Sequence, residues 1–143
     1  MTVSAILAEK GRSIVSVSID RSLTQVCDVL AKRRIGAVVV LDAAGGLAGI
    51  LSERDVVRAL ASDGPTALDR PVTTYMTRAV QTCAPQDAVS QVMERMTAGR
   101  FRHLPVLEGG VLVAVISIGD VVKHRIAQAE RDAADMRTYI HTA

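Results

Sequence analysis

Two short motifs of the form Ser-x-x-Asp carry the side chains best suited to holding a small polar molecule. They are Ser52 with Asp55 and Ser117 with Asp120, and each opens an apolar run with helical spacing. A carboxylate only accepts hydrogen bonds, so one aspartate can accept from both hydroxyls of a cis-diol. The first N–H groups of a helix favour phosphate. The motif predicts either a site for a phosphorylated diol or a simple capping box that stabilises the helix by about 1 kcal/mol.

Basic residues near these motifs could bind a phosphate group. Arg102 and His103 directly precede the apolar segment Leu104-Pro105-Val106, and Arg54 lies inside the first motif. The planar fork of a guanidinium suits bidentate binding of a phosphate group. The alternative is a solvated surface pair at 102–103, and for Arg54 an exposed helix residue paired with its acidic neighbours.

The sequence predicts neither catalysis nor a metal site. A nucleophile needs a base within reach and a third group to orient that base. The three histidines, His103, His124 and His141, are not paired with Ser or Cys at informative positions, and they lack metal-ligand spacing. We therefore expect a protein that is not an enzyme and uses no metal.

Composition argues against several classes of partner. The chain has 17 basic and 15 acidic side chains and only three aromatic rings, a poor match to a nucleic-acid-binding surface. No stretch reaches the ~18 apolar residues that a membrane span requires. Met1 to Gly11 lacks the apolar core of a signal peptide, and Cys27 and Cys83 form no disulfide framework. We expect a cytoplasmic protein that binds neither nucleic acid nor membrane.

The chain repeats itself. Gln25-Val26 recurs as Gln91-Val92, and Val40-Leu41 recurs as Val106-Leu107, both 66 residues later. After a glycine-containing turn the offset becomes 65, so that Ser52 and Asp55 fall on Ser117 and Asp120. The one-residue change in offset lies in turns, where a change of length is best tolerated.

Each copy predicts the same elements. A helix begins at the capping box of Ser22 and Gln25, or after Asp87 as its cap in the second copy. Apolar runs predict two strands and a second helix, preceded by a short leading strand. The leading strands are expected at 14–17 in the first copy and 80–82 in the second. The next strand is expected at 35–41 and 104–107, and the one after it at 47–51 and 111–116. The second helix is expected to begin at Ser52 and at Ser117.

The predicted fold class is α/β (α+β), with two pseudo-symmetric β-α-β-β-α repeats packed through their sheets. Residues 1–69 would form an N-terminal extension and the first repeat, and residues 70–143 the second repeat and a helical tail. Residues 62–71 are the expected linker, with Asp63-Gly64-Pro65 as its turn. A repeat of this size would be marginal alone, so we expect one compact module.

These residues resemble the CBS domain family. The resemblance rests on Thr77-Arg78, Val80 to Thr82, Phe101 to Val106 and Val115 to Val122, with Gly49 to Val57 repeating the ending in the first copy. It covers almost everything from Ser13 to Ala127 and is closest to small stand-alone CBS pairs. It implies a pseudo-symmetric pair, often a disc-shaped dimer of pairs, that binds AMP, ATP or related adenosyl ligands between the repeats.

The resemblance also implies roles for single residues. The aspartate would accept hydrogen bonds from ribose hydroxyls, and the serine would lie near ribose or phosphate. Arg102 and His103 align with the uncharged Gly36 and Ala37 of the first copy, so the site around Asp120 is expected to hold phosphate more firmly. The Asp55 site would depend on Arg54, Arg33 or Arg34. Expected nucleotide-binding residues are Asp120, Ser117, Arg102, His103, Ile118, Gly119, Thr82, Val80, Asp55, Ser52, Arg54 and Ser18.

Three functions remain open at this point. The first is a non-catalytic regulatory module, homodimeric, that binds AMP, ATP or NAD and acts on an unidentified protein by shifting between arrangements of its repeats. The second is a ligand-free scaffold that acts through dimerisation. The third, a small enzyme acting on nucleotides, lacks the required base and nucleophile.

Overall fold

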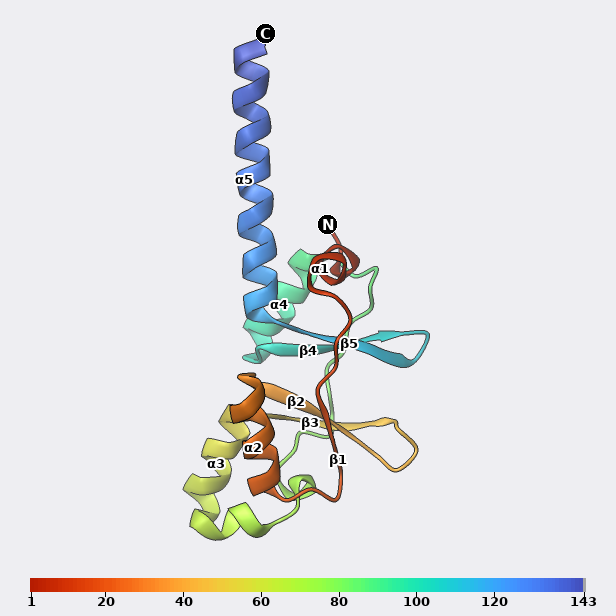
Figure 1. Cartoon of the computed structure of the whole chain (residues 1–143), viewed down its shortest axis with the longest axis vertical. Helices are drawn as coiled ribbons and strands as arrows, with labels where there is room; N and C mark the ends of the chain where they lie inside the picture. The colour runs from red at the N-terminus through yellow and green to blue at the C-terminus, as the bar shows by residue number, and fades with distance from the viewer. Residues whose placement is uncertain (143) are drawn as a thin grey trace.

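The computed structural model describes residues 1–142 and shows two α/β units stacked on each other, with one long helix projecting from the upper unit (Figure 1). The lower unit contains β1 (Ser16–Ser18), α2 (Leu23–Arg33), β2 (Ala37–Leu41), β3 (Leu47–Ser52) and α3 (Glu53–Asp63). Its sheet has the order β1-β2-β3, in which β1 runs parallel to β2 and β3 antiparallel.

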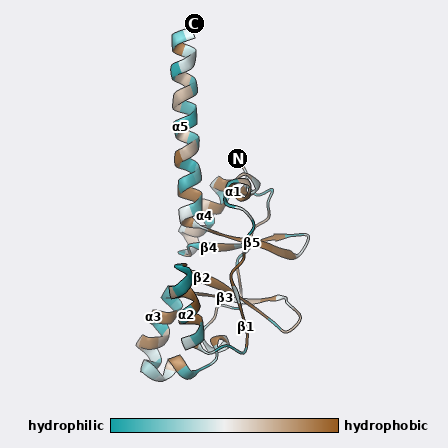
Figure 2. Ribbon diagram, viewed as in Figure 1, coloured by the Kyte–Doolittle hydropathy of each residue, from teal (hydrophilic) through white to brown (hydrophobic). Residues whose placement is uncertain are grey.

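The upper unit repeats this plan with one strand fewer. It contains α4 (Val89–Gly99), β4 (His103–Glu108), β5 (Val111–Ser117) and the start of α5 (Ile118–Thr142), and β4 pairs antiparallel with β5. The strands are predominantly hydrophobic (Figure 2). The prediction of two units packed through their sheets is therefore confirmed.

The leading strands differ from their predicted positions. The first is β1, which begins two residues later than expected and pairs with β2. In the second copy the expected strand at 80–82 does not form; the chain pairs there only through an isolated bridge between Cys83 and Val106. An isolated bridge leaves the preceding backbone outside the ladder, so residues 77–82 cross between the units as an irregular segment.

Local sequence explains where most helices begin. Ser22 Oγ accepts a hydrogen bond from the Gln25 amide (3.2 Å), and Gln25 Oε1 accepts one from the Ser22 amide (2.9 Å), which confirms the predicted capping box. The expected cap of α4 is wrong. Asp87 accepts a hydrogen bond from the Ala84 amide at 2.9 Å, within the preceding turn, and Ala88 holds the N-cap position.

Each unit has its own apolar core, and α1 (Val3–Lys10) packs in that of the upper unit. Val3 and Ile6 are buried beside the α4 and β5 side chains, and the Val3 amide donates to the Asp87 carbonyl at 2.9 Å. Conversely, Val72 and Met76, which follow the linker, pack in the core of the lower unit. The helix that precedes the lower unit in the sequence therefore packs in the upper core, and the segment that precedes the upper unit packs in the lower core.

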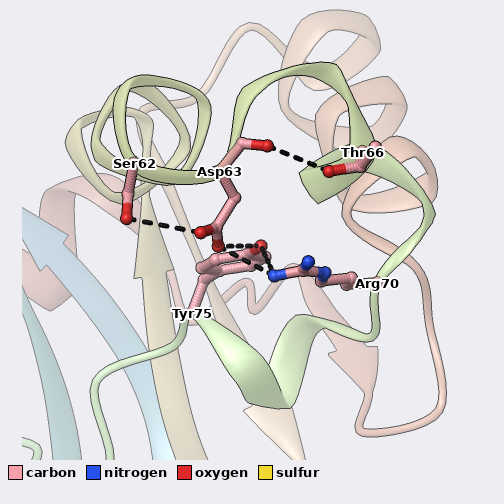
Figure 3. A network of polar contacts seen from close by, with 5 residues as sticks. All are labelled: Ser62, Asp63, Thr66, Arg70 and Tyr75. Carbon is pink, nitrogen blue, oxygen red and sulfur yellow. Dashed lines mark hydrogen bonds and ion pairs between the residues drawn. The ribbon is translucent and has the colours of Figure 1, made fainter.

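The linker is ordered by a polar network at the end of α3 (Figure 3). Tyr75 Oη and Arg70 Nη1 donate to Asp63 Oδ2 at 2.6 and 3.0 Å, and Thr66 Oγ1 donates to the Asp63 carbonyl at 2.9 Å. Thr66 lies in a short 3₁₀ turn, Gly64–Asp69, which Arg70 follows, and Tyr75 follows a second such turn, Val72–Thr74. One aspartate thus fixes the path between the two units.

The second helix of the upper unit and the predicted helical tail are one continuous element, α5. In the described part of the chain, no helix has an apolar stretch long enough to cross a bilayer.

Candidate nucleotide-binding cleft

A cleft of about 780 Å³ lies between the two units. The lower unit contributes the end of β3 and the start of α3, and the irregular segment that crosses between the units contributes one wall. The upper unit contributes the residues around the starts of β4 and α5. The lining residues are Gly36, Ala37, Ile50, Ser52, Glu53, Arg54, Asp55, Arg58, Thr77, Ala79, Val80, Gln81, Gly99, Arg100, Phe101, Arg102, His103, Ser117, Ile118 and Gly119.

Asp55 both caps a helix and presents an acceptor to this cleft. Its Oδ2 accepts hydrogen bonds from the amide of Ser52 at 2.8 Å and from the hydroxyl of Ser52 at 3.1 Å. The other oxygen, Oδ1, lies 4.0 Å from Arg58 Nη1. Capping therefore uses one carboxylate oxygen and leaves the second able to accept hydrogen bonds from a diol. The capping and binding interpretations of the motif are compatible at this residue.

Basic side chains dominate the charge of the cleft. Its lining includes four arginines, at positions 54, 58, 100 and 102, against the carboxylates of Glu53 and Asp55. Arg54 Nη1 donates to the Arg100 carbonyl at 3.2 Å and so links the two units across the cleft. This excess of guanidinium groups favours an anionic ligand.

His103 lies half-buried at the interface between the units. A Cβ on Gly36 would be 3.0 Å from His103 Cε1, so the absence of a side chain at 36 lets the ring pack against the opposite backbone. Burial lowers the pKa of His103 below its usual 6.5, and the nearby charge of Glu53 opposes this only in part. At neutral pH the imidazole is therefore uncharged and offers one donor and one acceptor.

Asp120, the counterpart of Asp55, has a different neighbour. Lys10, the last residue of α1, places Nζ 2.6 Å from Asp120 Oδ2 and 2.6 Å from the Val115 carbonyl. Burial acts to raise the pKa of Asp120, but the hydrogen bonds from Lys10 and Ser117 outweigh it, so the net pKa lies below 3.8. The Asp120 carboxylate is held by an ammonium group from its own chain.

The structure brings together most, but not all, of the residues expected to bind a nucleotide. Those that line the cleft are Ser52, Arg54, Asp55, Val80, Arg102, His103, Ser117, Ile118 and Gly119. Asp120, Thr82 and Ser18 are outside this lining. The Thr82 carbonyl accepts a hydrogen bond from Arg95 at 2.7 Å, and the Ser18 hydroxyl donates to Asp20.

The grouping of these residues differs from the one expected within each copy. Arg102 and His103 share the cleft with Asp55, which belongs to the other unit, because the two sheets are stacked on each other. Sequence reasoning also missed Arg58 and Arg100. Arg58 is one helical turn after Arg54, which is a readable signal. The position of Arg100 depends on how the units face each other.

The residues described hold no group of three or more His, Cys, Asp or Glu side chains suited to a metal ion.

Comparison with known proteins agrees with the doubled architecture. The sequence model of the family described as CBS domain matches residues 6–62 and again 72–127. The crystal structure of a CBS-domain containing protein from Agrobacterium tumefaciens is 46% identical, with a TM-score of 0.86, and the match covers 87% of this chain and 99% of that one.

Two further similarities are informative. A CBS domain protein from Pyrobaculum aerophilum, whose structure is complexed with AMP, is 30% identical with a TM-score of 0.75, over 84% of this chain and 89% of that one. The CBS domain-containing protein CBSCBSPB1 of Arabidopsis thaliana is 30% identical over 112 residues, which are 78% of this chain. The chain spans only about a fifth (21%) of the length of that relative. Since the family match covers most of the chain in two consecutive copies, the chain belongs to the CBS domain family as a tandem pair.

Proposed function

We propose that this chain is a non-catalytic regulatory module that binds an adenosine phosphate, AMP or ATP, in the cleft around Asp55. One observation carries the proposal: the cleft combines a carboxylate oxygen available to a diol with four guanidinium groups from both units. The AMP complex of the Pyrobaculum aerophilum relative supports this ligand class.

The residues suggest a division of the ligand among three parts of the cleft. Asp55 Oδ1 accepts hydrogen bonds from the ribose hydroxyls, while Ile50, Val80 and Ile118 form an apolar wall for the adenine. Arg102, together with Arg54 and its neighbours, binds the phosphate. NAD satisfies the same contacts through its adenosine half, and so remains in the test.

Binding in this position has a regulatory consequence. A ligand that contacts both Asp55 on α3 and Arg102 beside β4 favours arrangements in which the two units are closed on each other. We propose that a partner protein recognises this change of arrangement. We also propose that the chain acts as a homodimer in the cytoplasm. The ligand controls the partner only to the extent that it prefers one arrangement.

The surroundings of Asp120 are not part of this proposal. Lys10 Nζ already donates a hydrogen bond to Asp120 Oδ2, in the way that a ligand hydroxyl would. We propose that the cleft around Asp55 is the stronger site, because the Asp120 carboxylate already has an ammonium partner, Lys10, on its Oδ2.

Thermal unfolding in the presence of AMP, ADP, ATP, NAD and S-adenosylmethionine tests the proposal. A ligand present at a hundred times its Kd stabilises the native state by about 2.7 kcal/mol. For a chain of this size that raises Tm by on the order of 8 °C. Asp55→Asn should remove most of this rise.

The matched control is Asp120→Asn, which alters an equivalent helix cap and should keep the rise. A flat response to every compound in wild type would instead favour the ligand-free scaffold, for which the exposed apolar side chains of α5 are the supporting observation.

A further inference from the structure

The projecting half of α5 has an apolar face that nothing in its own chain covers. Every side chain from 129 to 142 is exposed, and the helix leaves the body of the molecule at this point (Figure 1). Ile126, Met136 and Ile140 are 55, 63 and 66% exposed. Hydrophobic residues recur along the helix among hydrophilic ones (Figure 2).

The spacing of these residues is that of a coiled coil. Apolar positions along α5 alternate in steps of four and three residues, which keeps them on one stripe of a supercoiled helix. The side chains in the stripe are Val122, Ile126, Ala129, Ala133, Met136 and Ile140. The buried residues Val121 and His124 lie on a different face, the one that contacts the body, so the stripe points away from the chain's own core.

The charges beside the stripe are complementary between two identical helices that run in the same direction. The core positions that follow a step of four residues are 126, 133 and 140. In a parallel pair, the residue just before each of them lies next to the residue five places later on the partner helix. Here Arg125 would meet Glu130 of the other copy, and Asp132 would meet Arg137. In an antiparallel pair with the same core layers, Glu130 would face Glu130 and Asp132 would face Asp132, which is repulsive.

We propose that α5 pairs with α5 of a second copy of this chain in a parallel, in-register coiled coil. The inference does not rest on nucleotide binding. Two alanines in the middle of the stripe let the helices approach closely but bury little area, so the pairing is reversible. The interface places the two bodies side by side at the same end of the paired helices.

Disulfide trapping tests both the pairing and its direction. In a parallel, in-register pair, residue 136 lies directly opposite its own copy, so Met136→Cys should form a covalent dimer under mild oxidation. Thr138→Cys is the matched control, because residue 138 is exposed on the outer face of the helix. Wild type accounts for crosslinks through Cys27 and Cys83. Crosslinking of Met136→Cys no greater than that of Thr138→Cys would overturn the proposal.

Charge reversal tests the register by sedimentation equilibrium. Glu130→Arg places two basic residues together twice in the dimer, and we expect its dimer dissociation constant to rise about fivefold. Adding Arg125→Glu exchanges the signs and should restore the constant to within about twofold of wild type. Both residues are exposed, so neither change disturbs the core. A dimer indifferent to Glu130→Arg, or a double variant as weak as the single one, contradicts the proposed register.

Discussion

At the scale of single residues, Asp55 and Asp120 show how equivalent positions acquire different roles. Both close a capping box with a serine three residues earlier, as the spacing predicted. They differ in what lies opposite: Asp55 faces the lining of a basic cleft, and Asp120 faces Lys10. The difference comes from α1, whose last residue reaches a carboxylate 110 positions away.

The Lys10–Asp120 pair should contribute to stability in a defined pH range. The pKa of Asp120 is lowered in the folded state, so its contribution is present above pH 3.8 and is lost as the pH falls through the folded pKa. Lys10→Met should lower the free energy of unfolding by about 1 kcal/mol near neutral pH. Urea unfolding near pH 7 and at a series of pH values below 3.8 measures this, and the deficit should shrink as the pH falls. Arg12→Met, which breaks the exposed pair with Glu108, is the control and should cost less.

His103 should make stability and binding respond to pH in opposite ways. Because its pKa is lowered in the folded state, the unfolded chain takes up the proton first as the pH falls below 6.5. The free energy of unfolding should therefore decrease as the pH falls below about 6.5, and His103→Gln should flatten this decrease. A bound phosphate favours the protonated ring, so affinity for AMP should rise over the same interval. His141→Gln, on the exposed end of α5, should leave both profiles unchanged.

At the scale of elements, α2 and α4 end in the same unusual way. Arg34 and Arg100 both adopt the left-handed conformation, with φ of 54° and 55°. These positions are equivalent in the repeat, so the strained ending is a property of the duplicated unit. A side chain at such a position costs roughly 1 kcal/mol relative to glycine.

Arg34→Gly should therefore stabilise the protein by about 0.5–1 kcal/mol, measured by urea unfolding. Arg34 is exposed and lies outside the cleft lining, whereas Arg100 lines the cleft and is unsuitable for this test. The control is Ala31→Gly within the same helix, which should destabilise by about 1 kcal/mol. A loss of stability in Arg34→Gly would show that its backbone conformation is not strained.

Most elements could be predicted because their signals are local. Capping boxes, apolar periodicity and glycine turns placed α2, α3, β2, β3, β4 and β5 close to their observed bounds. The misplaced features depend on distant contacts. Asp87 is drawn into a turn, and the expected strand at 80–82 pairs only at Cys83, because that segment must span from one unit to the other. The types of the neighbouring residues do not indicate that this segment has to connect the two units.

At the scale of the whole molecule, the two units are joined by exchanged segments. α1 packs in the upper core although it precedes the lower unit, and Val72 packs in the lower core although it follows the linker. This exchange explains why the site could be predicted only in part. The types of its residues were readable from the repeat, but their grouping depends on how the units face each other, which combines Asp55 with Arg102.

Titration calorimetry with AMP tests this grouping most directly. We predict that wild type and Asp120→Asn each bind one AMP per chain with similar affinity. Asp55→Asn should bind at least tenfold more weakly, because the ribose loses its charged acceptor. Loss of binding in Asp120→Asn together with unchanged binding in Asp55→Asn would contradict the account.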